Sequence, residues 1–184
     1  VVFNRLLNDL EQNPPKEPFM KIVQTSSSHE PFEVPFQRLD NPRLNAFAYA
    51  DSCAGDFVRR FKETPLWKNT VIILVPDHLG AYPQDIDNLT VDRYRIPLIF
   101  IGGAVKEPKH IDTYGSQIDI AATLLGQLGL PHEEFAFSKN MLNPASPHFG
   151  FFTFPNAFGM MTPENEVVFY CESNSVVSDE GEHK

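Results

Sequence analysis

The chain has 184 residues, of which 42% are hydrophobic and 12% aromatic, and 15 basic against 24 acidic side chains give it a net charge of -9. This size and composition are typical of one globular domain with a packed core and exclude a disordered chain. The negative net charge and the lack of a Lys/Arg cluster argue against a nucleic-acid partner. An anionic substrate is still compatible with it, because one bound divalent cation can outweigh the summed charge locally.

The two cysteines and the N-terminal residues bear on the kind of protein. Cys53 and Cys171 are too few and too far apart in sequence to form a disulfide framework. No apolar run approaches the roughly 18 residues that a membrane-spanning helix needs, and the first residues have no signal-peptide pattern. Because the chain also lacks an initiator Met, we expect a soluble fragment excised from a longer polypeptide.

The N-terminal half alternates helix-like and strand-like segments. Apolar residues at helical spacing from Val2 to Leu10 predict a short amphipathic helix that ends at Asn13-Pro14-Pro15. The apolar, partly β-branched residues 19–25 predict a buried strand, which an irregular Ser-rich loop follows. Residues 45–62 predict a helix whose apolar face covers a sheet.

Two continuous β-branched runs, residues 70–76 and 96–101, predict central parallel strands. Residues 116–128 predict a helix with Ser116 as its N-cap and Gly129 just past its end. Strands that alternate with helices predict an α/β layered fold, with a mainly parallel central sheet flanked by helices.

The pattern changes after about residue 144, where short β runs alternate with turn-forming residues. This predicts a C-terminal antiparallel β meander over residues 146–172. We expect the acidic tail, residues 178–184, to be frayed. Since there is no internal repeat and no low-complexity linker, residues 1–184 are predicted to belong to a single domain with its core at residues 19–142.

The strongest candidate for chemistry is the pair Asp77-His78, directly after the run at residues 70–76. Open α/β sheets place their ligand crevices at the carboxyl ends of strands. A carboxylate and an imidazole supply donors that Mn²⁺, Zn²⁺ or Mg²⁺ favours, and Gly80 would let the backbone turn away sharply. The alternative is that Asp77 caps a turn and His78 is a polar surface residue.

His29 occupies the equivalent place after residues 19–25, in a loop whose Ser hydroxyls and amides could donate to an anion. The two strand ends would then converge on one crevice. The alternative is that residues 26–28 form a turn and that His29, like Glu30, is exposed. A serine hydrolase triad in this loop is disfavoured, because adjacent Ser and His residues rarely have the required geometry.

Four other side chains could assist a site, but a structural role is preferred for each. Asp51 could orient a metal ligand, yet a solvated helix face is the simpler interpretation. Arg93 and Arg95 could bind phosphate or sulfate, yet such residues are more often surface ion-pair partners. Asp119 is interpreted as structural, either capping or bracing the neighbouring loop.

Several motifs share their order with one known family. They are Thr25-Ser26-Ser27-Ser28-His29-Glu30-Pro31-Phe32, Tyr49-Ala50-Asp51, Trp67-Lys68-Asn69-Thr70, Val75-Pro76-Asp77-His78, Arg95-Ile96-Pro97-Leu98-Ile99-Phe100, Ser116-Gln117-Ile118-Asp119-Ile120-Ala121-Ala122-Thr123-Leu124-Leu125 and Gly129-Leu130. This order resembles the sulfatase-type catalytic domain of lipoteichoic acid synthase-like proteins, of the alkaline phosphatase superfamily. The resemblance covers residues 19–142 and implies an alkaline phosphatase-like fold, of which this chain is the C-terminal portion.

The resemblance implies roles for three residues. Asp77 and His78 match a metal-ligand pair, and His29 matches a histidine that contacts the phosphate group of the substrate. The remaining acidic ligand and the nucleophile, a threonine or in relatives a serine or formylglycine, are expected upstream, in the missing N-terminal part of the polypeptide. No residue here is therefore assigned as catalytic, and the chain alone is expected to be inactive or nearly so. The implied cofactor is a divalent metal ion, with Mn²⁺ preferred over Zn²⁺, Mg²⁺ or Ca²⁺.

The implied function is metal-dependent phosphoryl transfer or hydrolysis, of the phosphoglycerol transferase or phosphodiesterase type. The cation would activate the nucleophile, and a covalent phospho-enzyme would pass its group to water or to an acceptor hydroxyl. The substrate would be an anionic phosphate or sulfate ester, with a lipid or a glycan as a candidate for the linked group. Sulfuric ester hydrolysis is the enzymatic alternative, and a non-catalytic binding module is the alternative from another class. For the full-length protein, the resemblance implies N-terminal membrane helices and the extracytoplasmic face of a bacterial membrane.

Overall fold

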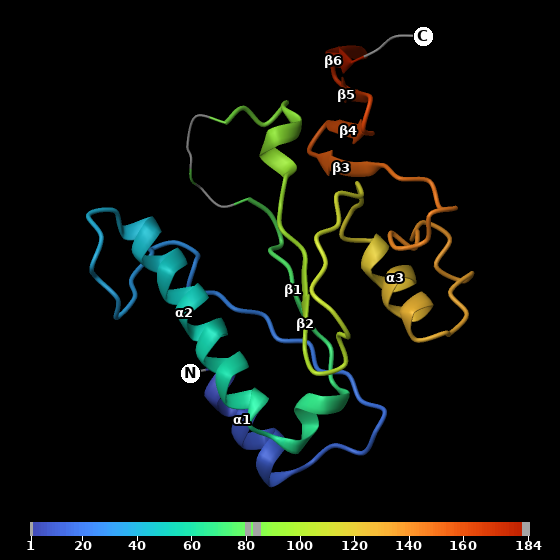
Figure 1. Ribbon diagram of the computed structural model, residues 1–184. Coiled ribbons are helices and arrows are strands. Elements are labelled where there is room, and N and C mark those ends of the chain that lie inside the picture. The colour runs from blue at the N-terminus through green and yellow to red at the C-terminus, as the bar shows by residue number, and fades with distance from the viewer. Residues whose placement is uncertain (1, 80–81, 83–85, 182–184) are drawn as a thin grey trace. The chain divides into compact units, whose positions relative to one another are not determined.

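The computed structural model describes residues 2–79, 82 and 86–181 (Figure 1). These residues form two compact units. The first unit comprises residues 2–74, 82 and 98–107, and the second comprises residues 75–79, 86–97 and 108–181. Each unit has its own hydrophobic cluster. The single domain remains a prediction, because two compact units can belong to one domain.

Two helices of the first unit confirm the sequence prediction. α1 (Val2–Gln12) ends just before the two adjacent prolines, and α2 (Pro42–Lys62) follows the N-cap Asn41. The Asn41 side chain accepts hydrogen bonds from the backbone N–H groups of Arg43 (2.9 Å) and Leu44 (3.3 Å). The first N–H groups of a helix have no partner inside it, and the Asn41 side chain supplies one. This cap explains why α2 begins at Pro42, before the predicted start at residue 45.

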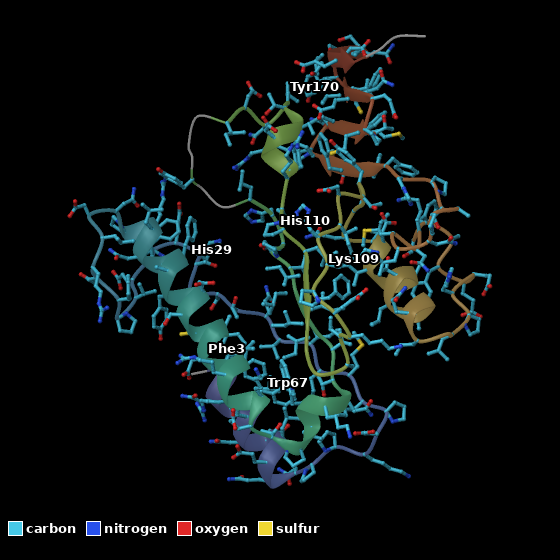
Figure 2. All side chains as sticks on the ribbon, viewed as in Figure 1. Phe3, His29, Trp67, Lys109, His110 and Tyr170 are labelled. Atoms are coloured by element: carbon cyan, nitrogen blue, oxygen red, sulfur yellow. The ribbon has the colours of Figure 1, made fainter. Side chains whose placement is uncertain are left out.

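Aromatic and aliphatic side chains hold α1 and α2 together. Phe57 and Phe61 lie one helical turn apart on α2 and pack against the buried Leu7 and Leu10 of α1. The two Phe rings stack with centroids 5.6 Å apart, and Trp67 meets Phe61 edge-on at 6.3 Å. This cluster is the core of the first unit, and Figure 2 labels Trp67 at its edge.

The two β-branched runs form an antiparallel pair. After the short helix η1 (Pro65–Asn69), β1 (Ile72–Leu74) pairs antiparallel with β2 (Ile99–Ile101). A parallel pair needs a crossover connection, usually an α-helix, whereas the described part of this connection contains only η2 (Val91–Tyr94). The prediction of parallel strands is not met by this pair, and every strand pair among the described residues is antiparallel.

Residues 19–25, predicted as a buried strand, are a coil. Phe19 packs against the cluster of the first unit, but Met20 and Ile22 are 75% and 84% exposed. A strand needs a neighbour to satisfy its backbone N–H and C=O groups. Within the described residues, neither sheet includes this segment. The β propensity of the segment was therefore insufficient, and this prediction is wrong for the chain as described.

The predicted antiparallel meander is confirmed in the second unit. β3 (Gly150–Phe154), β4 (Ala157–Met161), β5 (Asn165–Tyr170) and β6 (Ser175–Gly181) pair in chain order (Figure 1). Asn156, with a φ of 64°, closes the first hairpin. Such left-handed backbone is tolerated best by Gly, Asn and Asp, so the Pro-Asn turn signal in the sequence was informative.

The acidic tail, predicted to be frayed from residue 178, instead begins inside β6. Residues 178–181 belong to this strand, which pairs with β5. Acidic side chains on an edge strand can stay in solvent, so their charge is compatible with strand formation. The same charges discourage pairing of this edge with other chains. Residues 182–184 lie outside the described part of the chain.

One face of the four-stranded sheet is buried. Phe152, Met161 and Val168 cluster there with Val91 of η2. The ring of Tyr94 stacks on Phe152 with centroids 3.7 Å apart. Burial raises the pKa of the Tyr94 hydroxyl. These contacts make the inner face of the sheet the core of the second unit.

The predicted C-terminal helix is confirmed, but its N-cap is not. α3 (Asp119–Gln127) has Ile118 at the N-cap position, without a capping side chain. The Ser116 hydroxyl instead bonds the backbone of Phe151 in β3. Gly129 lies just past the helix with a φ of 66°, the left-handed conformation typical of a glycine C-cap.

Replacing a buried ring tests the core of the first unit. Phe61→Ala should lower the free energy of unfolding by about 3–5 kcal/mol, because Phe61 is only 2% exposed. Urea unfolding followed by circular dichroism measures the change. Phe137→Ala is the matched control, since Phe137 is 87% exposed. Equal unfolding midpoints for the two variants would contradict this account of the core.

Candidate metal site

Asp77 and His78 present one oxygen and one nitrogen donor side by side. His78 Nδ1 lies 2.7 Å from the backbone oxygen of Leu79. A carbonyl oxygen can only accept, so Nδ1 carries the proton and donates, which leaves Nε2 as the basic ring nitrogen. Nε2 lies 3.6 Å from Asp77 Oδ2. The expected turn at Gly80 lies outside the residues that the structure describes.

This pair fits a divalent cation. The Asp77 side chain is 84% exposed and that of His78 67%. Metal–ligand bonds of about 2.0–2.2 Å let one ion reach both donor atoms, and metal-bound histidines commonly donate their other N–H to a carbonyl. Within the described residues, no group of three or more His, Cys, Asp or Glu side chains could hold a metal ion. A complete site would therefore need ligands in addition to this pair.

Gln117 holds the backbone that carries the two donors. Its side-chain Nε2 donates to the carbonyl oxygens of Pro76 (2.7 Å) and Asp77 (2.8 Å). Sequence reasoning included Gln117 only as part of a motif and missed this contact. In the sequence, Gln117 is only a polar residue near the start of a helix. This position is compatible with many roles and does not indicate the contact with residues 76 and 77.

The buried Asp119 confirms its predicted bracing role. Its side chain is fully buried. The carboxylate accepts hydrogen bonds from the backbone N–H of Ser116 (2.8 Å), from the backbone N–H of Lys139 (2.8 Å) and from Lys139 Nζ (2.7 Å). A buried carboxylate is tolerated only when it is paired and hydrogen-bonded. Asp119 therefore ties the start of α3 to the loop at Lys139.

His29 lies in a turn of the first unit (Figure 2). Its backbone N–H donates to the Ser26 oxygen (3.1 Å), and its own oxygen accepts from the Phe32 N–H (3.0 Å). The ring is exposed, with Nδ1 3.2 Å from the Glu30 backbone oxygen. This is the exposed turn considered as the alternative. Since Asp77 and His78 belong to the second unit, their convergence with His29 on one crevice remains a prediction.

Asp51 and Arg95 take the structural roles that were preferred, whereas the ion-pair role of Arg93 stays a prediction. Asp51 is exposed on α2. Arg95 forms ion pairs with Asp92 (2.9 Å) and Glu166 (3.0 Å). Arg93 donates from Nε to a nearby asparagine side chain at 3.1 Å. These contacts are typical of a solvated surface.

A separate hollow of about 460 Å³ lies in the first unit. Its lining residues are Pro35, Phe36, Gln37, Arg38, Tyr49 and Ser52. A hydrogen bond with Cys53 raises the pKa of the Tyr49 hydroxyl. None of the predicted metal or phosphate contacts lines this hollow.

Comparisons with known sequences confirm the family resemblance. The profile of the family described as Sulfatase matches residues 1–130. Phosphoglycerol transferase I of Xanthomonas campestris pv. campestris (strain B100) is 29% identical over 143 residues, which cover 71% of this chain and 20% of that protein. The lipoteichoic acid synthase-like YvgJ of Bacillus subtilis (strain 168) is 26% identical over 154 residues, which cover 69% of this chain and 25% of that protein.

A solved structure shares the fold. The crystal structure of a protein in the alkaline phosphatase superfamily from Vibrio parahaemolyticus matches with a TM-score of 0.81 and 24% identity, over 100% of this chain and 48% of that chain. At this identity the likeness shows the fold alone.

The chain spans a quarter or less of the length of the two curated relatives. In the part of the chain that the structure describes, no helix combines the length and apolarity needed to cross a bilayer.

Removing the brace should destabilise the second unit. Asp119→Ala is expected to lower the free energy of unfolding by about 3–5 kcal/mol, because it leaves the ammonium of Lys139, whose side chain is only 13% exposed, without its carboxylate. Asp112→Ala is the control, since Asp112 and its partner His110 are both 88% exposed. Chemical unfolding followed by fluorescence compares the two. If Asp119→Ala unfolds at the same midpoint as Asp112→Ala, the brace does not stabilise the unit.

Proposed function

Because the chain belongs to the sulfatase family, we propose that it supplies part of the active site of a metal-dependent phosphoryl transferase or phosphodiesterase. The observation that carries the proposal is the Asp77-His78 pair, with Oδ2 and Nε2 3.6 Å apart. The relatives named phosphoglycerol transferase I support phosphoryl over sulfuryl transfer. The substrate class is an anionic ester, which suits a cation site on an otherwise acidic chain.

In the proposed site, Asp77 and His78 bind one divalent cation through Oδ2 and Nε2. Mixed oxygen and nitrogen donors make Mn²⁺ the preferred ion, with Zn²⁺, Mg²⁺ and Ca²⁺ as alternatives. When bound, such a cation supplies Lewis-acid stabilisation of charge on the transferred group. The Leu79 carbonyl keeps the imidazole proton on Nδ1, so the Nε2 lone pair stays available to the ion.

His29 is proposed to bind the phosphate group of the substrate. Its Nδ1 faces the Glu30 carbonyl at 3.2 Å and therefore carries a proton. A ring nitrogen that donates to an anionic phosphate oxygen forms a charge-assisted hydrogen bond, which is stronger than a neutral one.

The nucleophile and the acidic metal ligand are proposed to lie N-terminal to residue 1, in a longer polypeptide. The chain spans only 20% and 25% of the two curated relatives. We call the polypeptide that carries this chain with the rest of its sulfatase domain the complete domain. The mainly parallel central sheet belongs to the complete domain in this proposal. N-terminal membrane helices and an extracytoplasmic location would be properties of the whole protein.

Sulfuric ester hydrolysis is the second candidate function, because the matching family is that of the sulfatases. Both reactions use a cation to stabilise charge on a tetrahedral anion. The identity of the cleaved ester distinguishes the two candidates. A domain that cleaves neither ester would be a binding module.

Removing Asp77 tests the proposed function. With Mn²⁺, the complete domain should hydrolyse a phosphodiester, and Asp77→Ala should lower kcat/KM at least about 100-fold, since a catalytic metal contributes several kcal/mol. Asp112→Ala, at an exposed acidic residue, should retain activity. Activity that survives both chelation and Asp77→Ala would overturn the metal site, and cleavage of a sulfate ester alone would replace the phosphoryl proposal.

His29→Ala tests the proposed phosphate contact. Loss of one charge-assisted hydrogen bond, of about 1.5–3 kcal/mol, should lower kcat/KM for the phosphodiester roughly 10- to 100-fold. Metal affinity should be unchanged, because His29 is not proposed as a ligand. His110→Ala is the control, as its side chain is 88% exposed. Identical kinetics for both variants would remove His29 from the site.

A further inference from the structure

We propose that Gln117 is a positioning residue for the Asp77-His78 pair, whose side-chain amide fixes the backbone from which both donors extend. This inference rests on the proposed metal-binding function of the pair. It concerns a residue that binds neither metal nor substrate itself. All the contacts used below lie within the second unit.

The two hydrogen bonds from Gln117 restrain the direction of the Asp77 side chain. Nε2 donates to the carbonyl of Pro76 (2.7 Å) and to that of Asp77 (2.8 Å). These carbonyls belong to the peptide planes on either side of the Asp77 Cα. Fixing both planes fixes φ and ψ of Asp77, and with them the direction of its Cα–Cβ bond. The same restraint orients the peptide that leads into His78.

The other hydrogen bonds of the pair in the described chain are local. Asp77 Oδ1 accepts from the His78 backbone N–H at 3.0 Å, and His78 Nδ1 faces the Leu79 oxygen at 2.7 Å. Local bonds of this kind arrange the two donors relative to each other. They do not hold the segment in place. That restraint comes from Gln117, 40 residues away from Asp77 in sequence.

Gln117 can act as a restraint because the turn that carries it is itself held. The backbone N–H of the preceding Ser116 donates to the buried carboxylate of Asp119 at 2.8 Å. The Ser116 hydroxyl accepts from the Phe151 N–H (2.7 Å) and donates to the Phe151 oxygen (3.0 Å). The turn is thus tied to α3 and to β3, and it offers the Gln117 amide from a fixed position.

Gln117→Glu separates positioning from electrostatics. Glutamate has the same shape, but its carboxylate cannot donate and would face two carbonyl oxygens. The added negative charge by itself would strengthen cation binding. A decrease in metal affinity therefore requires loss of the restraint. Gln117 is exposed, so the substitution leaves the core intact.

The first test is Mn²⁺ affinity of the complete domain, measured by isothermal titration calorimetry. Gln117→Glu should weaken binding about 10- to 100-fold, as is typical when a group that orients a ligand is removed. Gln127→Glu makes the same change of charge at the exposed last residue of α3 and should leave the affinity unchanged. Binding by Gln117→Glu that is equal to or tighter than wild type overturns the inference.

The second test needs no metal and distinguishes the two proposals. Hydrogen–deuterium exchange of residues 75–79 in the metal-free domain should be faster in Gln117→Glu than in wild type, and unchanged in Gln127→Glu. Unchanged exchange in Gln117→Glu overturns the positioning role whether or not metal binds. A wild-type domain that fails to bind Mn²⁺ while Gln117→Glu still accelerates exchange overturns the metal function and leaves the restraint supported.

Discussion

A buried carboxylate must be fully hydrogen-bonded, and the fully buried Asp119 imposes this requirement on the second unit. Its partners are the Ser116 N–H and two donors of Lys139. Meeting the requirement joins the turn before α3 to a loop that is distant in sequence. From this turn Gln117 reaches the backbone of Asp77. The buried Asp119 carboxylate, which is not proposed to bind metal or substrate, therefore supports the position of the exposed Asp77-His78 pair.

Helices were predicted well from the sequence because local patterns determine them. The spacing of Phe57 and Phe61 defined the buried face of α2, and Gly129 marked the end of α3. A strand forms only beside a neighbouring strand, and the local sequence pattern does not specify that neighbour. Residues 19–25 have β propensity but no strand beside them in the described chain. The relative direction of β1 and β2 depends on their connection, which lacks a crossover helix in its described part.

The sequence suggested the residues of the proposed site but not the contacts that orient them. The position of Asp77-His78 after a β-branched run pointed to the pair. The bonds that orient it come from Leu79 and from Gln117, and the second is a tertiary contact that no spacing rule predicts. Arg95 and Asp119 took the structural roles expected of them. The convergence of His29 with the pair on one crevice stays a prediction.

The most direct test of the central claim is electron spin-echo spectroscopy of Mn²⁺ bound to the complete domain. Coordination by His78 Nε2 predicts modulation from a directly bound ¹⁴N nucleus. The signal should disappear in His78→Ala and persist in His110→Ala, whose histidine is 88% exposed. Bound Mn²⁺ without nitrogen coupling, or coupling that survives His78→Ala, would contradict the claim that the Asp77-His78 pair holds the metal.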